Sequence, residues 1–247
     1  MRSLLGWLLL CGVMLVASSS ECLSRSAGDD ESAFEKSLAL AELGDPQAQL
    51  DVGYRYANGN GVNKDAVKAL KWYLKAAEQG QPRAQYLLAL MYDTGLGPVE
   101  KNKASSLSWL RKSADQGYAK AQFLLGLYYS NGLGVPKDKT IAFSYYKKAA
   151  EQGDAVAQHN LACMLEEGIG VEKNEVEAYA YFELAAASQQ GAAQRLGALS
   201  KKMTEASCQA GKKRSLEIQN EMEQREQRRE IKRVEDEAEL KKRAMGA

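Results

Sequence analysis

Residues 44–80 read GDPQAQLDVGYRYANGNGVNKDAVKALKWYLKAAEQG, and residues 117–153 read GYAKAQFLLGLYYSNGLGVPKDKTIAFSYYKKAAEQG. Both stretches contain an Ala-Gln pair, a later tyrosine, a Gly-x-Gly-Val loop and a closing Ala-Ala-Glu-Gln-Gly. Self-similarity at a fixed period of this length is the sequence signature of a repeat protein. We therefore expect one structural unit that stacks repeatedly on copies of itself.

The same positions recur in four repeats along the chain. The boundary glycines Gly44, Gly80, Gly117 and Gly153 are separated by 36, 37 and 36 residues, and Pro98 accounts for the longer second repeat. The recurring positions are the alanines Ala48, Ala84, Ala121 and Ala157, then Tyr56, Tyr92, Tyr129 and Leu165, and the loop glycines Gly59, Gly61, Gly95, Gly97, Gly132, Gly134, Gly168 and Gly170. We assign structural roles to these residues.

Each repeat reads as two helices. The first glycine of each loop can adopt the left-handed conformation that ends a helix, and the second permits a tight turn. Three residues after each loop valine comes a strong N-cap residue, which predicts the start of the second helix. These residues are Asp65, Asn102, Asp138 and Asn174. Apolar residues then follow at helical spacing, and the fold class is predicted to be all-α.

The pattern A-Q-x-x-x-[GA]-x-x-Y-x-x-G-x-G-V-x-x-[DN], closing in A-A-E-Q-G, resembles the Sel-1-like repeat family, a relative of the tetratricopeptide repeats. The resemblance extends from about Ala33 to Lys202. It implies an α-α superhelix, which is a right-handed solenoid of two-helix repeats. It also implies an adaptor or scaffold that binds a protein or peptide partner and is not an enzyme.

The N-terminus has the layout of a secretory signal. Arg2 gives a positive start, Leu4 to Ala17 is almost wholly apolar, and small polar residues follow. Because the apolar run is short for a membrane span, we expect cleavage near Ser20 and export, with the bacterial periplasm as the compartment. An uncleaved membrane anchor is the alternative.

The predicted organisation follows from these patterns. It comprises a signal peptide (1–20), a flexible linker (21–30), the solenoid (31–202) and a charged C-terminal helix (203–247). Within the solenoid we expect a half repeat at 31–43, full repeats at 44–79, 80–116, 117–152 and 153–190, and a terminal half repeat at 191–202 that starts from Ala193-Gln194.

The C-terminal segment is rich in both charges. Residues 201–247 contain 13 Lys and Arg and 10 Asp and Glu. Ile231, Val234, Ala238 and Met245 fall near heptad positions, but Lys241 interrupts them. We expect a solvated helix or a partly disordered tail rather than a coiled coil, and self-association through this helix stays open as an alternative.

Composition and motifs argue against several function classes. With 33 Lys and Arg against 32 Asp and Glu, no global charge attracts nucleic acid. His159 aligns with Leu50 of the first repeat and Cys163 with Tyr54, so both are interpreted as packing residues. No metal site, cofactor or catalytic residue is predicted. Some secreted members of the family carry a cysteine pair in each repeat and have been proposed to bind or hydrolyse β-lactams. Because those pairs are missing here, an enzyme acting on β-lactams or cell-wall material is only an alternative.

A row of variable residues on the first helices is the candidate binding face. The third, seventh and tenth residues after each alanine share one face because they are spaced by four and three. The residues predicted to bind a partner are Arg55, Leu87, Met91, Leu124, Tyr128 and Met164. The alternative is that the leucines of this row only widen the core stripe.

Overall fold

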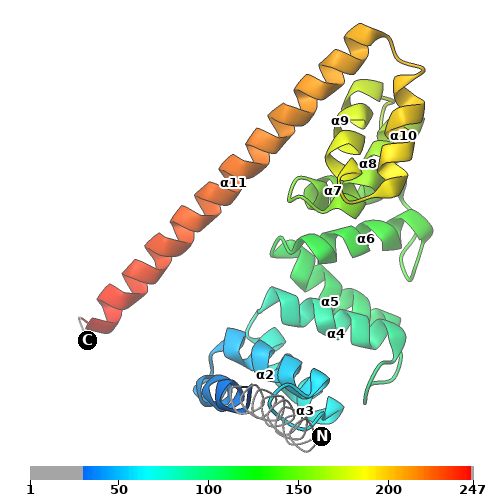
Figure 1. The fold of residues 1–247 in the computed structure, drawn as a ribbon. Helices are drawn as coiled ribbons and strands as arrows, with labels where there is room; N and C mark the ends of the chain where they lie inside the picture. The colour runs from blue at the N-terminus through cyan, green and yellow to red at the C-terminus, as the bar shows by residue number, and fades with distance from the viewer. Residues whose placement is uncertain (1–29, 246–247) are drawn as a thin grey trace, which may run out of the picture. The chain divides into compact units, whose positions relative to one another are not determined.

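The computed structural model describes residues 30–245, and every regular element in that range is a helix. The predicted signal peptide and almost all of the predicted linker lie outside the described residues. A helix over residues 30–42 is followed by the elements labelled in Figure 1. They are α2 (Pro46–Asn58), α3 (Ala66–Glu78), α4 (Pro82–Thr94), α5 (Lys103–Asp115), α6 (Ala119–Asn131), α7 (Lys139–Ala150), α8 (Ala155–Glu167), α9 (Glu175–Ala186), α10 (Gln190–Ser200) and α11 (Glu205–Met245).

The chain divides into two compact units. The first ends at Ser113, within the last turns of α5, and the second begins at Ala114. In the first unit α2 packs on α3 and α3 on α4, and in the second α6, α7, α8 and α9 pack in the same successive way. Within each unit, consecutive helices therefore stack as antiparallel hairpins, as expected of a solenoid.

Glycine and N-cap residues set the helix ends as the sequence predicts. Gly59, Gly95, Gly132 and Gly168 all end their helices in the left-handed conformation. The side chains of Asp65, Asn102, Asp138 and Asn174 each accept a hydrogen bond from the backbone N–H three residues later, so all four predicted N-caps are confirmed. Local sequence thus fixes where each hairpin turns.

The Ala-Gln pair that opens each repeat lies in the core. The four alanines are buried, and so are the four glutamines that follow them. Each glutamine donates its Nε2 to the carbonyl of an alanine eight residues earlier, at 3.0–3.2 Å, in the pairs Gln49–Ala41, Gln85–Ala77, Gln122–Ala114 and Gln158–Ala150. The sequence reveals the recurrence of the glutamine, and the structure explains it as a bond between successive hairpins.

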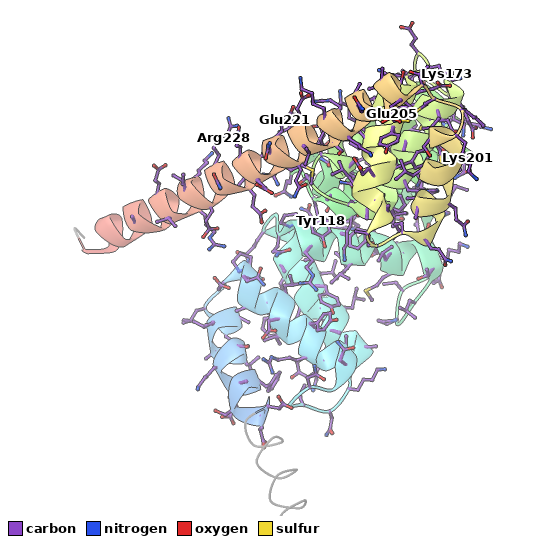
Figure 2. The ribbon with its side chains drawn as sticks, turned by 45° about the horizontal axis from the view of Figure 1, so that its top comes forward. Tyr118, Lys173, Lys201, Glu205, Glu221 and Arg228 are labelled. Atoms are coloured by element: carbon purple, nitrogen blue, oxygen red, sulfur yellow. The ribbon has the colours of Figure 1, made fainter. Side chains whose placement is uncertain are left out.

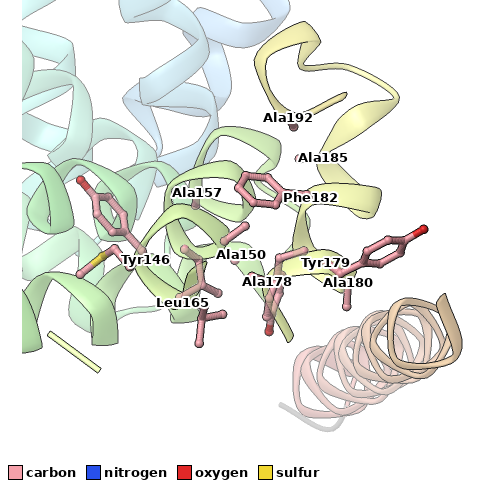
Figure 3. Packing of buried hydrophobic residues seen from close by; sticks show 14 of the residues in the cluster. Tyr146, Ala150, Ala157, Leu165, Ala178, Tyr179, Ala180, Phe182, Ala185 and Ala192 are labelled. Carbon is pink, nitrogen blue, oxygen red and sulfur yellow. The ribbon is translucent and has the colours of Figure 1, made fainter. Parts of the chain in front are cut away.

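Larger side chains fill the space around the small ones in the second unit. Phe182 of α9 is fully buried among alanines of α8 and α10, and Tyr146 of α7 packs in the same core (Figure 3). Close approach of the helices depends on the small residues, because protein interiors are packed to near-crystalline density.

One predicted register is wrong. Ala192, rather than Ala193, is buried on α10, and Gln194 is exposed. The cause is Gly191, which was expected to mark a repeat boundary. Whereas Gly44, Gly80, Gly117 and Gly153 have positive φ angles, Gly191 lies inside α10 and has none, so no turn resets the phase there.

The C-terminal helix is only partly solvated. Thr204 caps α11 by accepting a hydrogen bond from the Ser207 N–H at 3.2 Å. The first half of α11 then packs along α9, where Gly211 lies against the ring of Tyr179 and Ile218 is 3% exposed. Figure 3 shows Tyr179 and Ala180 on the side of α9 that faces α11. The expectation of a solvated tail is therefore wrong for this half.

Polar contacts extend this docking along the helix. Arg214 bonds to Glu177 of α9 at 3.0 Å, Arg225 to Glu151 at 2.9 Å, and Arg229 to Gln152 at 3.1 Å. Figure 2 shows the charged side chains that follow one another along α11, including Glu205, Glu221 and Arg228.

Candidate functional site

The residues predicted to bind a partner have different environments. Arg55 is engaged within α2, where its Nε lies 2.8 Å from a carboxylate oxygen of Asp51. Burial opposes ionisation of Asp51, but hydrogen bonds from Arg55 and Ser37 outweigh it and lower the pKa of the carboxyl group. Arg55 therefore has an intramolecular role whether or not it meets a partner.

Tyr128 and Met164 belong to the interior of the second unit. Their exposed fractions are 2% and 6%, so a rigid partner cannot reach either side chain. Leu124 is half-buried on the same helix as Tyr128. For Tyr128 and Met164 the geometry favours the packing alternative, and their role in partner binding stays a prediction.

Leu87 and Met91 line a groove in the first compact unit. The groove has a volume of about 470 Å³ and runs between α3 and α4. Its lining is mostly apolar and consists of Ala57, Lys64, Ala66, Ala69, Tyr73, Leu87, Leu90, Met91, Thr94, Leu96 and Gly97. Pockets that bind ligands commonly measure roughly 300–1,000 Å³ and carry few polar groups. The groove therefore has the size and chemistry of a binding site.

The rim of the groove adds exposed apolar surface. Leu96, in the loop between α4 and α5, is 68% exposed. Met91 is half-buried, and methionine adapts its shape to different partners because it is unbranched. Exposed apolar surface next to a hollow is typical of interaction sites on soluble proteins.

Lys64 supplies the charge of the groove. The other ionisable group in the lining is Tyr73, and burial raises the pKa of this phenol to about 12, so it is neutral at pH 7. Lys64 is exposed and makes no ion pair in the part of the chain that the structure describes. An occupant of the groove thus meets apolar walls and one positive charge.

The face chosen from the sequence included Leu87, Met91 and Thr94 of this site, and the first two were predicted to bind a partner. Sequence reasoning missed Lys64, Leu90 and Leu96, because these residues lie outside the face chosen from the spacing along the first helices. The available signal was the one-residue insertion at Pro98, next to the loop that closes the groove.

The histidine and cysteine of the second unit lie close together. The Nε2 of His159 is 3.7 Å from the Sγ of Cys163, and Arg195 pairs with Glu166 at 3.1 Å nearby. Burial, with a smaller contribution from Arg195, lowers the pKa of His159, and burial raises the pKa of Cys163. Both shifts favour a neutral imidazole beside a neutral thiol, whereas a cysteine nucleophile needs the thiolate.

Within 30–245, no cluster of three or more His, Cys, Asp or Glu side chains has the arrangement of a metal site. Nor does any described helix combine the length and apolar character that a membrane span requires.

Comparison with known proteins identifies the repeat. The family model described as Sel1 repeat matches residues 46–81, 82–118, 119–154 and 155–189. A solved Sel1 repeat protein from Oxalobacter formigenes has a TM-score of 0.67 and 40% sequence identity, with 69% of this chain and 49% of that chain covered. This similarity confirms the predicted fold class, an all-α solenoid of two-helix repeats.

Two curated relatives share shorter stretches. The ERAD-associated E3 ubiquitin-protein ligase component HRD3A of Arabidopsis thaliana is 36% identical over 76 residues, which are 30% of this chain and 11% of that protein. The chitin synthase regulator SKT5 of Saccharomyces cerevisiae is 37% identical over 75 residues, again 30% of this chain and 11% of that protein. The fold shared by these proteins is consistent with protein–protein interaction. With four Sel1 repeats over more than half of its 247 residues, the chain belongs to the Sel1 repeat family.

Proposed function

We propose that this protein is an exported, non-catalytic scaffold that binds a protein or peptide partner. The observation that carries the proposal is the apolar groove between α3 and α4, which is open beside the exposed side chain of Leu96. Stacked hairpins offer an extended surface on which such a groove can present side chains to a partner.

The state of the His159 and Cys163 side chains supports a non-catalytic role. A thiol acts as a nucleophile when a neighbouring positive charge or base stabilises the thiolate. Burial acts in the opposite direction on both groups. This pair therefore gives no support to the alternative of an enzyme acting on β-lactams or cell-wall material.

Export rests on the sequence pattern of residues 1–20. The direct test fuses residues 1–30 to an alkaline phosphatase that is active only in an oxidising compartment. We expect activity outside the cytoplasm and a mature N-terminus near Ser20. A fusion in which Leu8 and Leu9 are replaced by arginine should stay inactive, since charge disrupts the apolar region of a signal. Equal activity of both fusions would contradict export.

Partner binding is tested by affinity capture followed by reconstitution. The mature protein is immobilised, the native envelope extract is passed over it, and captured proteins are identified by mass spectrometry. Each candidate is then purified and titrated against the full chain. Saturable binding of at least one purified protein supports the scaffold function, whereas failure of every candidate to bind contradicts it.

A second candidate function is self-association through the end of α11. Ile231 and Val234, three residues apart on one helical face, are 58% and 55% exposed, and both follow Arg229, which bonds to Gln152. Two such faces can bury each other, as in a short coiled coil.

The structure refines the test of this second candidate. Truncation at residue 205 would also remove the docked half of α11, so the change should be confined to the exposed face. Sedimentation of the full chain is compared with that of the I231E/V234E double variant. A concentration-dependent dimer that the double variant abolishes supports self-association, and a monomer at every concentration contradicts it.

A further inference from the structure

The groove between α3 and α4 is bordered by a loop that carries one inserted residue. In the first, third and fourth repeats the loop reads Gly-x-Gly-Val, whereas the second reads Gly95-Leu-Gly-Pro98-Val99. The bond that closes the loop is unchanged, since the Asn102 N–H donates to the Tyr92 carbonyl at 2.7 Å just as Asp138 donates to Tyr129 at 2.9 Å. With both ends of the loop held, the additional residue must bulge outward.

The other loops show what the insertion changes. A Cβ placed on Gly170 would lie 2.5 Å from the carbonyl carbon and oxygen of Lys139, and one on Gly61 would lie 2.1 Å from the carbonyl oxygen of Asp30. In both cases the loop rests on the first turn of the preceding second helix. A Cβ placed on Gly97 would lie 3.9 Å from the Cβ of Ala66, the matching residue at the start of α3. The second loop therefore stands off from the helix on which it would otherwise rest.

Two methionines at matching positions show how the second and fourth repeats differ. Met91 and Met164 hold the same position in their repeats, seven residues after the opening alanine. Met164 is buried, while Met91 is half-buried and lines the groove. The repeat with the longer loop therefore has an apolar hollow where the fourth repeat has a buried methionine.

Charge indicates what the hollow accepts. Lys64 is the charged side chain of the lining, and Asp65 beside it is engaged as the N-cap of α3. A cationic occupant would be repelled by Lys64, whereas an acidic one would be attracted. An acidic group beside an apolar one satisfies both parts of the groove.

We propose that this groove binds a peptide segment of the partner in which a large apolar side chain enters between α3 and α4 and a neighbouring carboxylate pairs with Lys64. The proposal rests on the scaffold function and assigns its binding site and partner chemistry. A peptide is favoured over a small lipid because the apolar surface continues outside the hollow onto exposed Leu96, which needs a longer occupant to cover it.

The test uses a displayed library of random twelve-residue peptides selected on the full chain. Enriched peptides are synthesised with a fluorophore and titrated by polarisation. We expect them to pair an aliphatic or aromatic residue with Asp or Glu. Lys64→Glu should weaken binding about tenfold or more, since attraction becomes repulsion. Changing the acidic residue of the peptide to lysine should restore binding to that variant and weaken binding to the unchanged protein.

Matched variants localise the effect. Lys137 holds the position of Lys64 in the third repeat, and both are exposed, so Lys137→Glu should leave binding unchanged. Ala66→Trp should fill the groove from an exposed position on the first turn of α3, and deletion of Pro98 should close it by restoring the usual loop length. Thermal unfolding followed by circular dichroism identifies any variant that is not folded.

The outcomes separate this inference from the scaffold function. The inference would be overturned if the selected peptides showed no preference for acidic residues. It would also be overturned if Ala66→Trp and the Pro98 deletion both left peptide binding intact. Dodecanoate serves as the lipid probe. If no peptide is selected, and dodecanoate binds the unchanged protein but not the Ala66→Trp variant, the groove is a lipid site and the inference is overturned. If a purified native partner still binds the Ala66→Trp variant at full strength, the scaffold function stands and this site fails.

Discussion

The ring of Tyr146 lies directly against Gly126, so that a Cβ at Gly126 would be 2.7 Å from the Cδ1 of the tyrosine. The first compact unit repeats the arrangement with Gly53 and Tyr73, at 2.6 Å. At the matching positions of the other two repeats, the sequence has alanine in place of glycine and leucine or phenylalanine in place of tyrosine, in the pairs Ala89–Leu110 and Ala162–Phe182. The first helix therefore has glycine where the second has a buried tyrosine.

This contact predicts that Gly126→Ala destabilises the protein. Alanine favours a helix by about 1 kcal/mol over glycine, but overpacking a core costs about 1–3 kcal/mol, and the rigid ring leaves no room to relax. Gly197 on α10 is the control, because a Cβ there would meet nothing within 4 Å. Urea unfolding should show lower stability for Gly126→Ala and higher stability for Gly197→Ala. A gain in both variants would show that the tyrosine moves aside.

The buried glutamines should contribute to stability through their hydrogen bonds to the alanine carbonyls. Gln85→Leu removes the bond to the Ala77 carbonyl, which keeps its bond from the Gly80 N–H, so we expect a loss of about 1 kcal/mol in the free energy of unfolding. Gln194, the exposed glutamine of α10, provides the control, and its replacement by leucine should change the value by less than about 0.5 kcal/mol. Equal effects at the two positions would refute a specific role for the buried bond.

Two isoleucines of α11 should respond differently to the same substitution. Ile218→Ala removes methyl groups from the contact with α9 and should cost about 2–5 kcal/mol, while Ile231→Ala on the exposed part of the helix should have almost no effect on the monomer. Hydrogen exchange of α9 amides measures the difference, because loss of the docked helix should speed exchange there. Unchanged exchange in the Ile218 variant would show that α11 does not dock in solution.

The reactivity of Cys163 should be that of a partly buried thiol. Burial raises its pKa above the ordinary thiol value, so the unreactive thiol form persists to higher pH and alkylation by iodoacetamide stays slow at pH 7–8. The rate should rise only at more alkaline pH than for a free cysteine, as followed by peptide mass spectrometry. Rapid alkylation near pH 7 would indicate a stabilised thiolate and would revive the enzyme alternative.

The fold was largely predictable because its signals are local. The glycines that end the first helices and the residues that cap the second helices each act within a few residues, and four copies of the pattern reinforced the prediction. The wrong register at Ala193 also came from a local signal, the glycine at position 191. Gly191 follows the earlier boundary glycines at a similar interval, but it lies inside α10 and lacks their positive φ angle.

The candidate site was less predictable because it depends on contacts between repeats. The face chosen from helical spacing included Tyr128 and Met164, whose burial is decided by helices elsewhere in the chain. Docking of α11 was missed for the same reason. Its mixed charges suggested solvation, yet Arg214 and Arg225 bond to carboxylates of the repeats, and Ile218 and Gly211 supply the apolar contact.

The docked half of α11 has a consequence for protein engineering. It covers Tyr179 and the side of α9 next to it, so the last hairpin already has a neighbour and does not need another repeat to shield it. Arrays of different length could therefore be joined ahead of Glu151 while residues 151–229, which include the partners of Arg225 and Arg229, are retained as a ready-made terminus. Such chimaeras would vary the number of surfaces available for binding without exposing the apolar face of the last hairpin.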